Sequence, residues 1–371
     1  MRRIAYVTPL YFGDDSCVGG GERYPQNLAK GVALSAPEKY SVDLITFGTR
    51  PSQRELAPGV ALRVIVAAGV PRTPFEAVSW ELPATLDEYD LVHVHQSATR
   101  CGEVAVAVAK QLRKPTVITD HGAHTSTLGL EYGLAELADA VVAYSDFGAA
   151  LHHVKSTPIH VVKGGVDSDV FTPTNGVRVR DRFTYVGRLL PHKGIDRLID
   201  ALPADLPLTV CGRVYHEDYF RLLRSKAEGK LVEFVTDADD EAILALYRRA
   251  WANVLSSVHT DCYGNSFVAP ELMGFTLLEA MACGTPAICA RTAAMPEFVD
   301  HGETGFVYDD LASLTNILQL LASDSSLVER LGRQAREAVE ARFDLRAAGR
   351  SMAKLYDDLI DSESGSAREA A

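Results

Sequence analysis

Short, continuously apolar runs recur along the whole chain, and stretches with helical spacing separate them. The runs cover residues 3–11, 42–46, 61–67, 91–95, 116–119, 140–144 and 159–162, and then 183–186, 208–211, 231–235, 253–256, 287–290 and 306–308. Strands without polar alternation are typical of a parallel sheet that helices cover on both faces. The two sets of runs therefore predict an α/β protein with two Rossmann-like domains.

The predicted boundary between these domains is the polar, turn-rich segment 173–181. We expect an N-terminal domain over residues 1–172 and a C-terminal domain over residues 182–343. A final helix is expected over residues 344–361, where apolar residues recur at helical spacing. The small, polar residues 362–371 predict a disordered tail.

Composition narrows the function. A chain of 371 residues with 47% hydrophobic residues can bury the cores of two domains, and its net charge of −12 argues against a nucleic-acid-binding protein. The six cysteines contain no Cys-x-x-Cys pair, which argues against a disulfide framework or a zinc cluster. The first apolar run is too short for a signal peptide or a membrane span, so we expect a cytoplasmic protein.

Two glutamates, Glu271 and Glu279, flank a turn at Gly274 and lie before and within an apolar helical run. The start of that helix offers backbone N–H groups to the oxygens of a polar ligand. An alternative is purely structural, because Thr276 and Glu279 also fit a capping box. A cap does not explain the acid at Glu271, so the segment favours a ligand site.

Two cations follow the first strand of the second half, in the sequence Gly187-Arg188…Lys193-Gly194. The planar fork of Arg188 and the point charge of Lys193 suit the two phosphates of a nucleoside diphosphate. Fixed cations would also stabilise the charge that such a leaving group gains. The alternative is two solvated cations on a loop.

A glycine run, Gly19-Gly20-Gly21-Glu22, follows the first apolar run and opens a predicted helix over residues 23–34. Glycines let a backbone approach a ligand closely, and the helix start favours an anion. The run is not Gly-x-Gly-x-x-Gly, which counts against a dinucleotide-dependent dehydrogenase.

Four histidines, His93, His95, His121 and His124, lie at the ends of two consecutive predicted strands. Imidazoles two residues apart on a strand share a face, which provides half of a zinc site and suggests a metal-dependent hydrolase as a rival function. No carboxylate within these motifs completes a ligand set. The alternative is that they are polar residues at strand ends.

These motifs together resemble family 4 of the retaining glycosyltransferases, which have the GT-B architecture of two facing Rossmann-like domains. The resemblance covers nearly the whole chain and includes the segment 162–171, where Gly164 stands in place of the usual Asn. The chain departs from the family in the long stretch 257–270, where a short link is usual. It also has Leu272-Met273-Gly274-Phe275 where Gly-Phe-Gly is usual, which puts the identity of the sugar in doubt.

The resemblance implies transfer of a sugar from a nucleoside-diphosphate sugar to an acceptor hydroxyl, with retention, no protein nucleophile, no metal and no other cofactor. It implies that the terminal helix crosses back to the first domain. It assigns the leaving diphosphate to Arg188 and Lys193, the sugar hydroxyls to Glu271, the ribose to Glu279, and a position facing the transferred sugar to His121. The remaining donor contacts that it implies are Gly20, Gly21, Gly187, Gly274, Phe275 and Thr276.

Three other functions remain open at this stage: a sugar-nucleotide epimerase or hydrolase of the same fold, the metal-dependent hydrolase, and a nucleotide-sugar binding module without activity. Some relatives act at membranes through a basic amphipathic helix. The candidate helix 100–114 carries four basic residues, whose charge Glu103 partly offsets. Stable binding to a membrane surface usually needs more cations or a lipid anchor. A soluble acceptor is therefore favoured over peripheral membrane contact.

Overall fold

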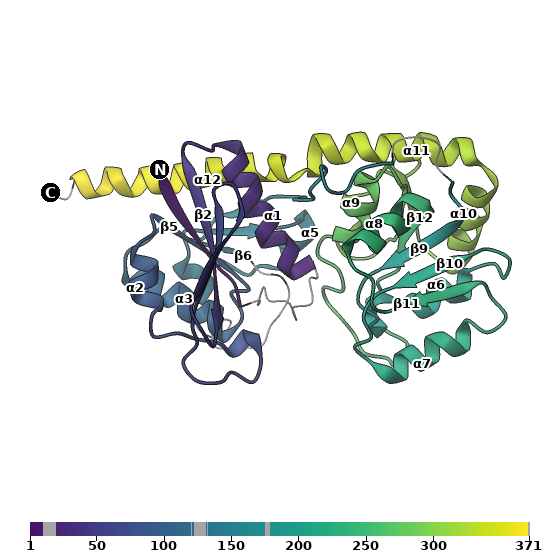
Figure 1. Cartoon of the computed structure of the whole chain (residues 1–371), viewed down its shortest axis with the longest axis horizontal. Coiled ribbons are helices and arrows are strands. Elements are labelled where there is room, and N and C mark those ends of the chain that lie inside the picture. The colour runs from purple at the N-terminus through teal and green to yellow at the C-terminus, as the bar shows by residue number, and fades with distance from the viewer. Residues whose placement is uncertain (10–19, 120, 122–130, 132, 175–178, 370–371) are drawn as a thin grey trace. The chain divides into compact units, whose positions relative to one another are not determined.

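A computed structural model describes residues 1–9, 20–119, 121, 131, 133–174 and 179–369 of the chain. The chain folds into two compact units, one made of Met1–Gly165 with Leu345–Ala371 and the other of Val166–Asp344 (Figure 1). The sequence had suggested a boundary slightly later, in residues 173–181, of which 175–178 lie outside the described residues.

The first unit contains an eight-stranded sheet with the order β3-β4-β2-β1-β5-β6-β7-β8, parallel except for the antiparallel pair β3 and β4. The strands are β1 (Arg2–Val7), β2 (Tyr40–Gly48), β3 (Ser52–Ala57), β4 (Val60–Val66), β5 (Leu91–His95), β6 (Thr116–Thr119), β7 (Ala140–Ala143) and β8 (Ile159–Val161). All seven runs predicted in this half form strands. The edge strand β3 was not predicted, because its sequence SQRELA is polar and largely exposed.

The second unit contains a six-stranded, wholly parallel sheet with the order β11-β10-β9-β12-β13-β14. Its strands are β9 (Arg182–Val186), β10 (Leu208–Cys211), β11 (Val232–Val235), β12 (Ala250–Leu255), β13 (Ala287–Ala290) and β14 (Gly305–Tyr308). Counted from β9, this order is 3-2-1-4-5-6, the doubly wound order of dinucleotide-binding folds. The prediction of two Rossmann-like sheets is confirmed.

Helices cover both sheets. In the first unit they are α1 (Gly20–Ser35), α2 (Leu82–Asp87), α3 (Arg100–Gln111), α5 (Asp146–Leu151) and α12 (Leu345–Glu369), with 3₁₀ turns η1 (Pro74–Glu76) and η2 (Leu134–Leu137). In the second they are α6 (Ile195–Ala201), α7 (Glu217–Lys226), α8 (Asp240–Arg249), α9 (Phe275–Ala282), α10 (Leu311–Ser323) and α11 (Ser325–Ala338), with 3₁₀ turns η3 (Pro191–Lys193) and η4 (Met295–Glu297) and the π-helix η5 (Val339–Phe343). Helix α6 packs against α7 and α10, whereas α8 and α11 pack against α9.

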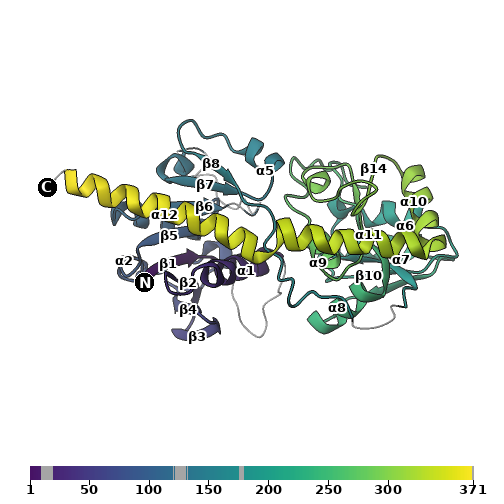
Figure 2. The ribbon, with the colours of Figure 1, turned by 90° about the horizontal axis from the view of Figure 1, so that it is seen from above.

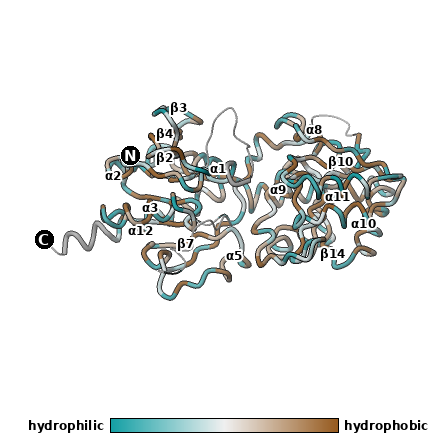
Figure 3. The backbone as a smooth tube through the Cα atoms, turned by 90° about the horizontal axis from the view of Figure 1, so that it is seen from below, coloured by the Kyte–Doolittle hydropathy of each residue, from teal (hydrophilic) through white to brown (hydrophobic). Residues whose placement is uncertain are grey.

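Along the chain of each unit, hydrophobic stretches (brown in Figure 3) alternate with hydrophilic ones (teal). Within the first sheet, Val92 and Val94 of β5 pack into a buried core with residues of α2 and α3. Successive side chains of a strand point to opposite faces. His93 and His95 therefore occupy the other face of the sheet, where His93 contacts Tyr356 of α12.

Helices α1 and α12 lie side by side on this face, as Figures 1 and 2 both show. Their contact depends on two glycines, Gly31 and Gly349. A Cβ atom on Gly31 would lie 2.1 Å from the carbonyl oxygen of Leu345, and one on Gly349 would lie 2.1 Å from the carbonyl carbon of Gly31. Helix α12 continues to Glu369, through residues for which the sequence suggested a disordered tail.

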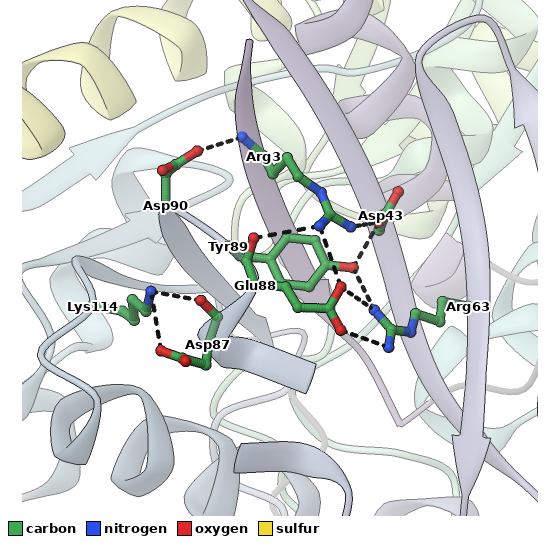
Figure 4. Close-up of polar contacts among 8 residues, drawn as sticks. All are labelled: Arg3, Asp43, Arg63, Asp87, Glu88, Tyr89, Asp90 and Lys114. Atoms are coloured by element: carbon green, nitrogen blue, oxygen red, sulfur yellow. Dashed lines mark hydrogen bonds and ion pairs between the residues drawn. The ribbon is translucent and has the colours of Figure 1, made fainter. Parts of the chain in front are cut away.

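Ion pairs tie together the strands of the first sheet near their amino ends (Figure 4). Arg3 of β1 lies 3.1 Å from Asp43 of β2 and 3.2 Å from Glu88. Glu88 also accepts two hydrogen bonds of 2.9 Å from Arg63 of β4, and the Tyr89 hydroxyl donates to Asp43 at 2.6 Å. This network is structural, because ligands of such folds bind at the opposite, carboxyl ends of the strands.

Candidate functional site

The loop after β9 carries the first two predicted site residues, Gly187 and Arg188. A Cβ atom on Gly187 would lie 2.9 Å from the Tyr185 hydroxyl, which donates a hydrogen bond of 3.1 Å to the Arg188 carbonyl oxygen. The Arg188 side chain is exposed, and no carboxylate of the described residues forms an ion pair with it. Its guanidinium is therefore available to an anion.

Lys193 lies at the end of η3 and is only 8% exposed. Its Nζ donates to Glu271 Oε2 at 2.9 Å and to the Pro270 carbonyl oxygen at 3.2 Å. A lysine ammonium has three hydrogens, so these two bonds leave one for a ligand oxygen. The structure thus brings together Lys193 and Glu271, two residues that the sequence had assigned to different parts of the donor.

Glu271 is fixed by the same contact and by one more hydrogen bond. Its Oε1 atom accepts from the backbone N–H of Gly274 at 3.2 Å. Burial by itself would raise the pKa of Glu271, but the charge and hydrogen bond of Lys193, the Gly274 N–H and the charge of Arg188 together hold that pKa below its usual value. The carboxylate is therefore ionised at neutral pH and available as a hydrogen-bond acceptor.

Helix α9 begins directly after Gly274, which adopts the left-handed conformation with φ of 78°. Gly274 itself is the N-cap, and no side-chain hydrogen bond caps the helix. Thr276 consequently lies inside the first turn, and the capping-box interpretation of Thr276 and Glu279 is wrong. Because the N-cap residue Gly274 has no side chain to cap the helix, the N–H groups of Phe275 and Thr276 stay compatible with a ligand.

Glu279 lies one turn further along α9 and is 3% exposed. Its Oε2 atom accepts a hydrogen bond of 2.8 Å from the hydroxyl of Tyr247 in α8. Tyr247 was not a candidate from the sequence, since nothing in the helical pattern of α8 distinguishes a hydroxyl that reaches a neighbouring helix. This hydrogen bond helps to fix the orientation of the Glu279 carboxylate.

In the first unit, His93 is fully buried and both its ring nitrogens are engaged. Nδ1 lies 2.7 Å from the Tyr356 hydroxyl, and Nε2 lies 2.7 Å from Oγ1 of Thr119. Burial, reinforced by His121, lowers the pKa of His93 to about 3. His93 is therefore a neutral structural residue at physiological pH, as the strand-end interpretation predicted.

His121 follows β6 and lies in a chain of ring contacts. Its Nε2 atom is 3.0 Å from Nδ1 of His95, and its Nδ1 atom is hydrogen-bonded to the hydroxyl of Tyr144. His95 is fully buried, which lowers its pKa well below the usual value, and its Nε2 atom has no hydrogen-bond partner among the residues that the structure describes. Tyr144 was not foreseen from the sequence, because only the fold brings β7 beside β6.

The histidines do not assemble a metal site in the described part of the chain. Among the residues that the structure describes, no group of three His, Cys, Asp or Glu side chains is arranged as metal ligands. His124, the fourth histidine of the rival interpretation, lies outside the described residues.

The predicted glycine loop is also only partly described. Gly19 lies outside the described residues, whereas Gly20 and Gly21 form the start of α1, three residues earlier than the helix expected from the sequence. Later in the chain, the segment that resembles the family at residues 162–171 meets α1. The Asn27 side chain donates a hydrogen bond of 2.9 Å to the carbonyl oxygen of Gly165.

Comparison with known proteins decides the family. Residues 18–170 match the model of glycosyltransferase family 4, and residues 178–338 match that of the glycosyl transferases group 1. The chain belongs to the family 4 glycosyltransferases. The two matched segments cover most of the chain, one in each sheet-containing unit, which confirms the resemblance seen in the motifs. The epimerase and metal-dependent hydrolase alternatives are not supported.

The relatives of this glycosyltransferase agree with that assignment. The D-inositol 3-phosphate glycosyltransferases of Corynebacterium efficiens and Corynebacterium glutamicum are each 28% identical to it, over 91% and 96% of this chain and 90% and 96% of theirs. Among solved structures, sucrose-phosphate synthase from Thermosynechococcus elongatus has a TM-score of 0.74 at 24% identity, covering 98% of this chain and all of that one. Anabaena Alr3699/HepE in complex with UDP and glucose has a TM-score of 0.73 at 20% identity, covering 97% and 100%. These likenesses confirm the GT-B fold.

None of the helices in the described part of the glycosyltransferase is long and apolar enough to cross a membrane.

Proposed function

We propose that this protein is a retaining glycosyltransferase that moves a sugar from a nucleoside-diphosphate sugar to an acceptor hydroxyl without a metal ion. The observation that carries the proposal is the buried Lys193–Glu271 ion pair of 2.9 Å, placed directly before the uncapped start of α9. The Alr3699/HepE structures with UDP and with UDP-glucose support a nucleotide sugar as donor.

Arg188 and Lys193 are proposed to bind the diphosphate. Arg188 offers an exposed guanidinium fork that pairs with no carboxylate in the described part of the chain, and Lys193 offers the hydrogen that Glu271 and Pro270 leave unused. Charge develops on the diphosphate as the glycosidic bond breaks, so cations that are already in place lower the barrier electrostatically. The N-terminus of α9 adds a positive partial charge, and together these groups replace a metal.

Glu271 and Glu279 are proposed to bind hydroxyl groups of the donor. Each Glu271 oxygen already accepts one hydrogen bond, from Gly274 or from Lys193. A carboxylate oxygen has two lone pairs, so each oxygen can also accept from a sugar hydroxyl. Glu279 accepts a hydrogen bond from Tyr247 through Oε2, and its carboxylate is proposed to accept further hydrogen bonds from ribose hydroxyls.

Retention is proposed to occur by attack on the same face from which the diphosphate leaves. The new bond joins the acceptor oxygen to the anomeric carbon as the bond to the phosphate oxygen breaks, and the acceptor proton passes to the leaving phosphate. No side chain then has to act as a nucleophile. His121 is proposed to contact the transferred sugar, and Gly20, Gly21 and Gly187 are proposed as close backbone contacts.

The acceptor is proposed to be a soluble hydroxyl compound. The names of the Corynebacterium relatives indicate that those proteins act on a phosphorylated cyclic polyol. A phosphorylated polyol is therefore the first acceptor class to be tested here.

Thermal unfolding with a panel of nucleoside diphosphates and nucleotide sugars, with and without EDTA, tests the proposal. A ligand at a hundred times its Kd should stabilise the protein by about 2.7 kcal/mol, which corresponds to a Tm increase of roughly 5–10 °C for a domain of this size. NMR of the product should then show the anomeric configuration of the donor. No stabilisation by any nucleotide would refute the proposal, and an inverted product would refute retention alone. Lys193→Ala should weaken this stabilisation, whereas Lys226→Ala, which removes a half-buried lysine paired with Asp200 in the same unit, should leave it unchanged.

A further inference from the structure

The stretch between β12 and Glu271, residues 256–270, forms a loop with its own internal structure. Thr260 and Ser266 form an antiparallel bridge. Between them, the Asp261 carboxylate accepts hydrogen bonds from the backbone N–H groups of Tyr263 and Asn265 at 2.9 Å and from the Asn265 side chain at 3.0 Å. The 256–270 loop thus contains a closed hairpin over residues 260–266.

Both ends of the 256–270 loop are attached to Lys193. The Ser256 hydroxyl donates to the Lys193 carbonyl oxygen at 2.8 Å, and the Pro270 carbonyl oxygen accepts from Lys193 Nζ at 3.2 Å. Next to Ser256, the N–H of Val258 donates to the carbonyl oxygen of His192 at 2.9 Å. The loop therefore begins and ends at the cation that is proposed to bind the diphosphate.

Two ring contacts extend the 256–270 loop over neighbouring strand ends. The Phe267 ring lies 4.8 Å from the ring of His192, in the loop that follows β9. The Tyr263 ring lies 5.5 Å from the ring of His216, which follows β10, and the two are nearly parallel at 19°. Because β9, β10 and β12 are adjacent and parallel, the loop lies along the carboxyl edge where such sheets bind ligands.

The 256–270 loop contains no Lys or Arg, one acidic residue and one histidine, His259. Its single acidic residue, Asp261, is occupied by the hairpin, and its exposed residues include Tyr263, Asn265, Ser266 and Val268. Burial, together with the charges of Lys193 and Arg188, lowers the pKa of His192 to about 4, so its ring is also neutral at physiological pH. Aromatic, amide and aliphatic groups without charge suit a sugar ring and not a phosphate.

We propose that the 256–270 loop is the wall that selects the sugar of the donor, and that Phe267, packed on His192, is a specificity-determining residue. The inference rests on the proposed function, because it divides the same donor between two surfaces. The cations after β9 hold the diphosphate, which all donors of one nucleotide share. The neutral loop contacts the sugar, in which those donors differ.

The test compares Phe267→Ala with the wild-type protein. We would measure kcat/KM for UDP-glucose, UDP-galactose and UDP-N-acetylglucosamine, or for the same sugars on whichever nucleotide stabilises the protein, together with the Kd of the free nucleoside diphosphate. The loss of an aromatic contact should change the ratio between the best and the second donor by about tenfold. The Kd of the nucleoside diphosphate should change less than about twofold.

The matched control is Phe306→Ala, because Phe306 forms a comparable ring contact of 5.4 Å with His301 in the same unit. It should leave the donor ratio unchanged. Phe267→Leu, which keeps the apolar volume without the ring, replaces Phe267→Ala if the alanine variant does not fold.

An unchanged donor ratio, or an equal loss for every donor and for the free diphosphate, would refute the selectivity role. Failure of the wild-type protein to bind any nucleoside diphosphate would instead refute the proposed function, so the two failures are distinguishable.

Discussion

Replacing Glu271 by Gln separates the contribution of the Lys193–Glu271 ion pair to stability from its proposed contribution to donor binding. The substitution keeps the shape and a hydrogen-bond acceptor at Glu271 but removes the negative charge beside the Lys193 ammonium. Two unit charges 2.9 Å apart attract each other by about 6 kcal/mol at an effective dielectric constant of 20. Most of that attraction offsets the cost of removing both groups from water.

The net effect can be estimated from burial. The side chains of Lys193 and Glu271 are 10% and 17% exposed, and loss of one partner of a buried pair typically costs about 3–5 kcal/mol. Because glutamine still accepts a hydrogen bond, we expect Glu271→Gln to lower the free energy of unfolding by about 2–3 kcal/mol. For a domain of this size that is a decrease in Tm of roughly 5–10 °C.

Ligand binding should respond in the opposite direction. Lys193 without its counter-charge attracts a phosphate more strongly, so the variant should bind a free nucleoside diphosphate at least as tightly as the wild-type protein. Turnover should nevertheless fall, since the variant lacks the carboxylate proposed to hold the sugar hydroxyls. Calorimetric titration with the diphosphate and an assay with the full donor measure the two effects separately.

The pH dependence of stability tests whether the charge of Glu271 stabilises the folded protein. Lys193 and the other contacts hold the pKa of Glu271 below its unfolded value of about 4.3. The stability from the ion pair is thus fully present above about pH 4.3 and is lost as the pH falls through the lower folded value. The difference in stability between the wild-type protein and Glu271→Gln should therefore narrow below about pH 4.3. Glu303→Gln, at an exposed turn position, is the control.

Two outcomes would refute this reasoning. The ion pair would have no structural role if Glu271→Gln melted at the wild-type temperature at neutral pH. The electrostatic account would be wrong if the variant bound the nucleoside diphosphate more weakly than the wild-type protein does.

Four further predictions follow from the geometry. Arg188→Ala should lower turnover by about a hundredfold, whereas Arg221→Ala, at an exposed position, should not; equal rates in a steady-state assay would return Arg188 to a solvated loop residue. Tyr356→Phe should lower the free energy of unfolding in urea by about 1–3 kcal/mol, since its hydroxyl meets Tyr6 and His93, each at 2.7 Å; no loss would contradict the buried network. Because the pKa of His93 is about 3 in the folded protein and about 6.5 in the unfolded chain, only the unfolded chain binds this proton between about pH 6.5 and 3. The free energy of unfolding should therefore fall as the pH decreases through this range, by about 1.4 kcal/mol per pH unit for this group. In His93→Gln this decrease should be shallower. Gly31→Ala should destabilise the protein because of the 2.1 Å approach to Leu345, although the same change in an open helix would stabilise it by about 1 kcal/mol; a higher Tm would show that α1 and α12 can separate without cost.

The sheets were predictable because their strands are continuously apolar, a pattern that local sequence reveals. Strand β3 was missed because it lacks this apolar pattern. It lies at the edge of the sheet, and nothing in its polar local sequence distinguishes it from a loop. The cap of α9 was misassigned because Thr276 and Glu279 have capping-box spacing. The left-handed Gly274 instead starts the helix two residues earlier than a cap at Thr276 would have started it.

The sequence allowed the candidate site residues to be named singly, but it did not allow their contacts to be predicted. The motifs containing Lys193 and Glu271 are separated by 78 residues, and no spacing rule predicts that their side chains form an ion pair. The sequence singled out none of Tyr247, Tyr144 and Phe267 individually, because the contact of a hydroxyl or ring with its neighbour becomes visible only when the elements are packed. Whether each candidate acts as proposed stays a prediction for the variants above.

A buried amide in the second unit links the strand before Lys193 to the helix after Glu271. Asn253 of β12 is fully buried; its Oδ1 atom accepts from Thr184 of β9 at 3.1 Å, and its Nδ2 atom donates to the Thr276 carbonyl oxygen in α9 at 3.2 Å. The strands β9 and β12 are the two at which the order of a doubly wound sheet reverses, and ligands of such sheets bind there. Asn253 therefore connects the strand that precedes Arg188 and Lys193 with the helix that follows Glu271. An apolar residue of the same size would fill the space, but it would leave Thr184 and the start of α9 without this link. We infer that this amide helps to align the charged pair, because its two hydrogen bonds have a direction that apolar packing lacks.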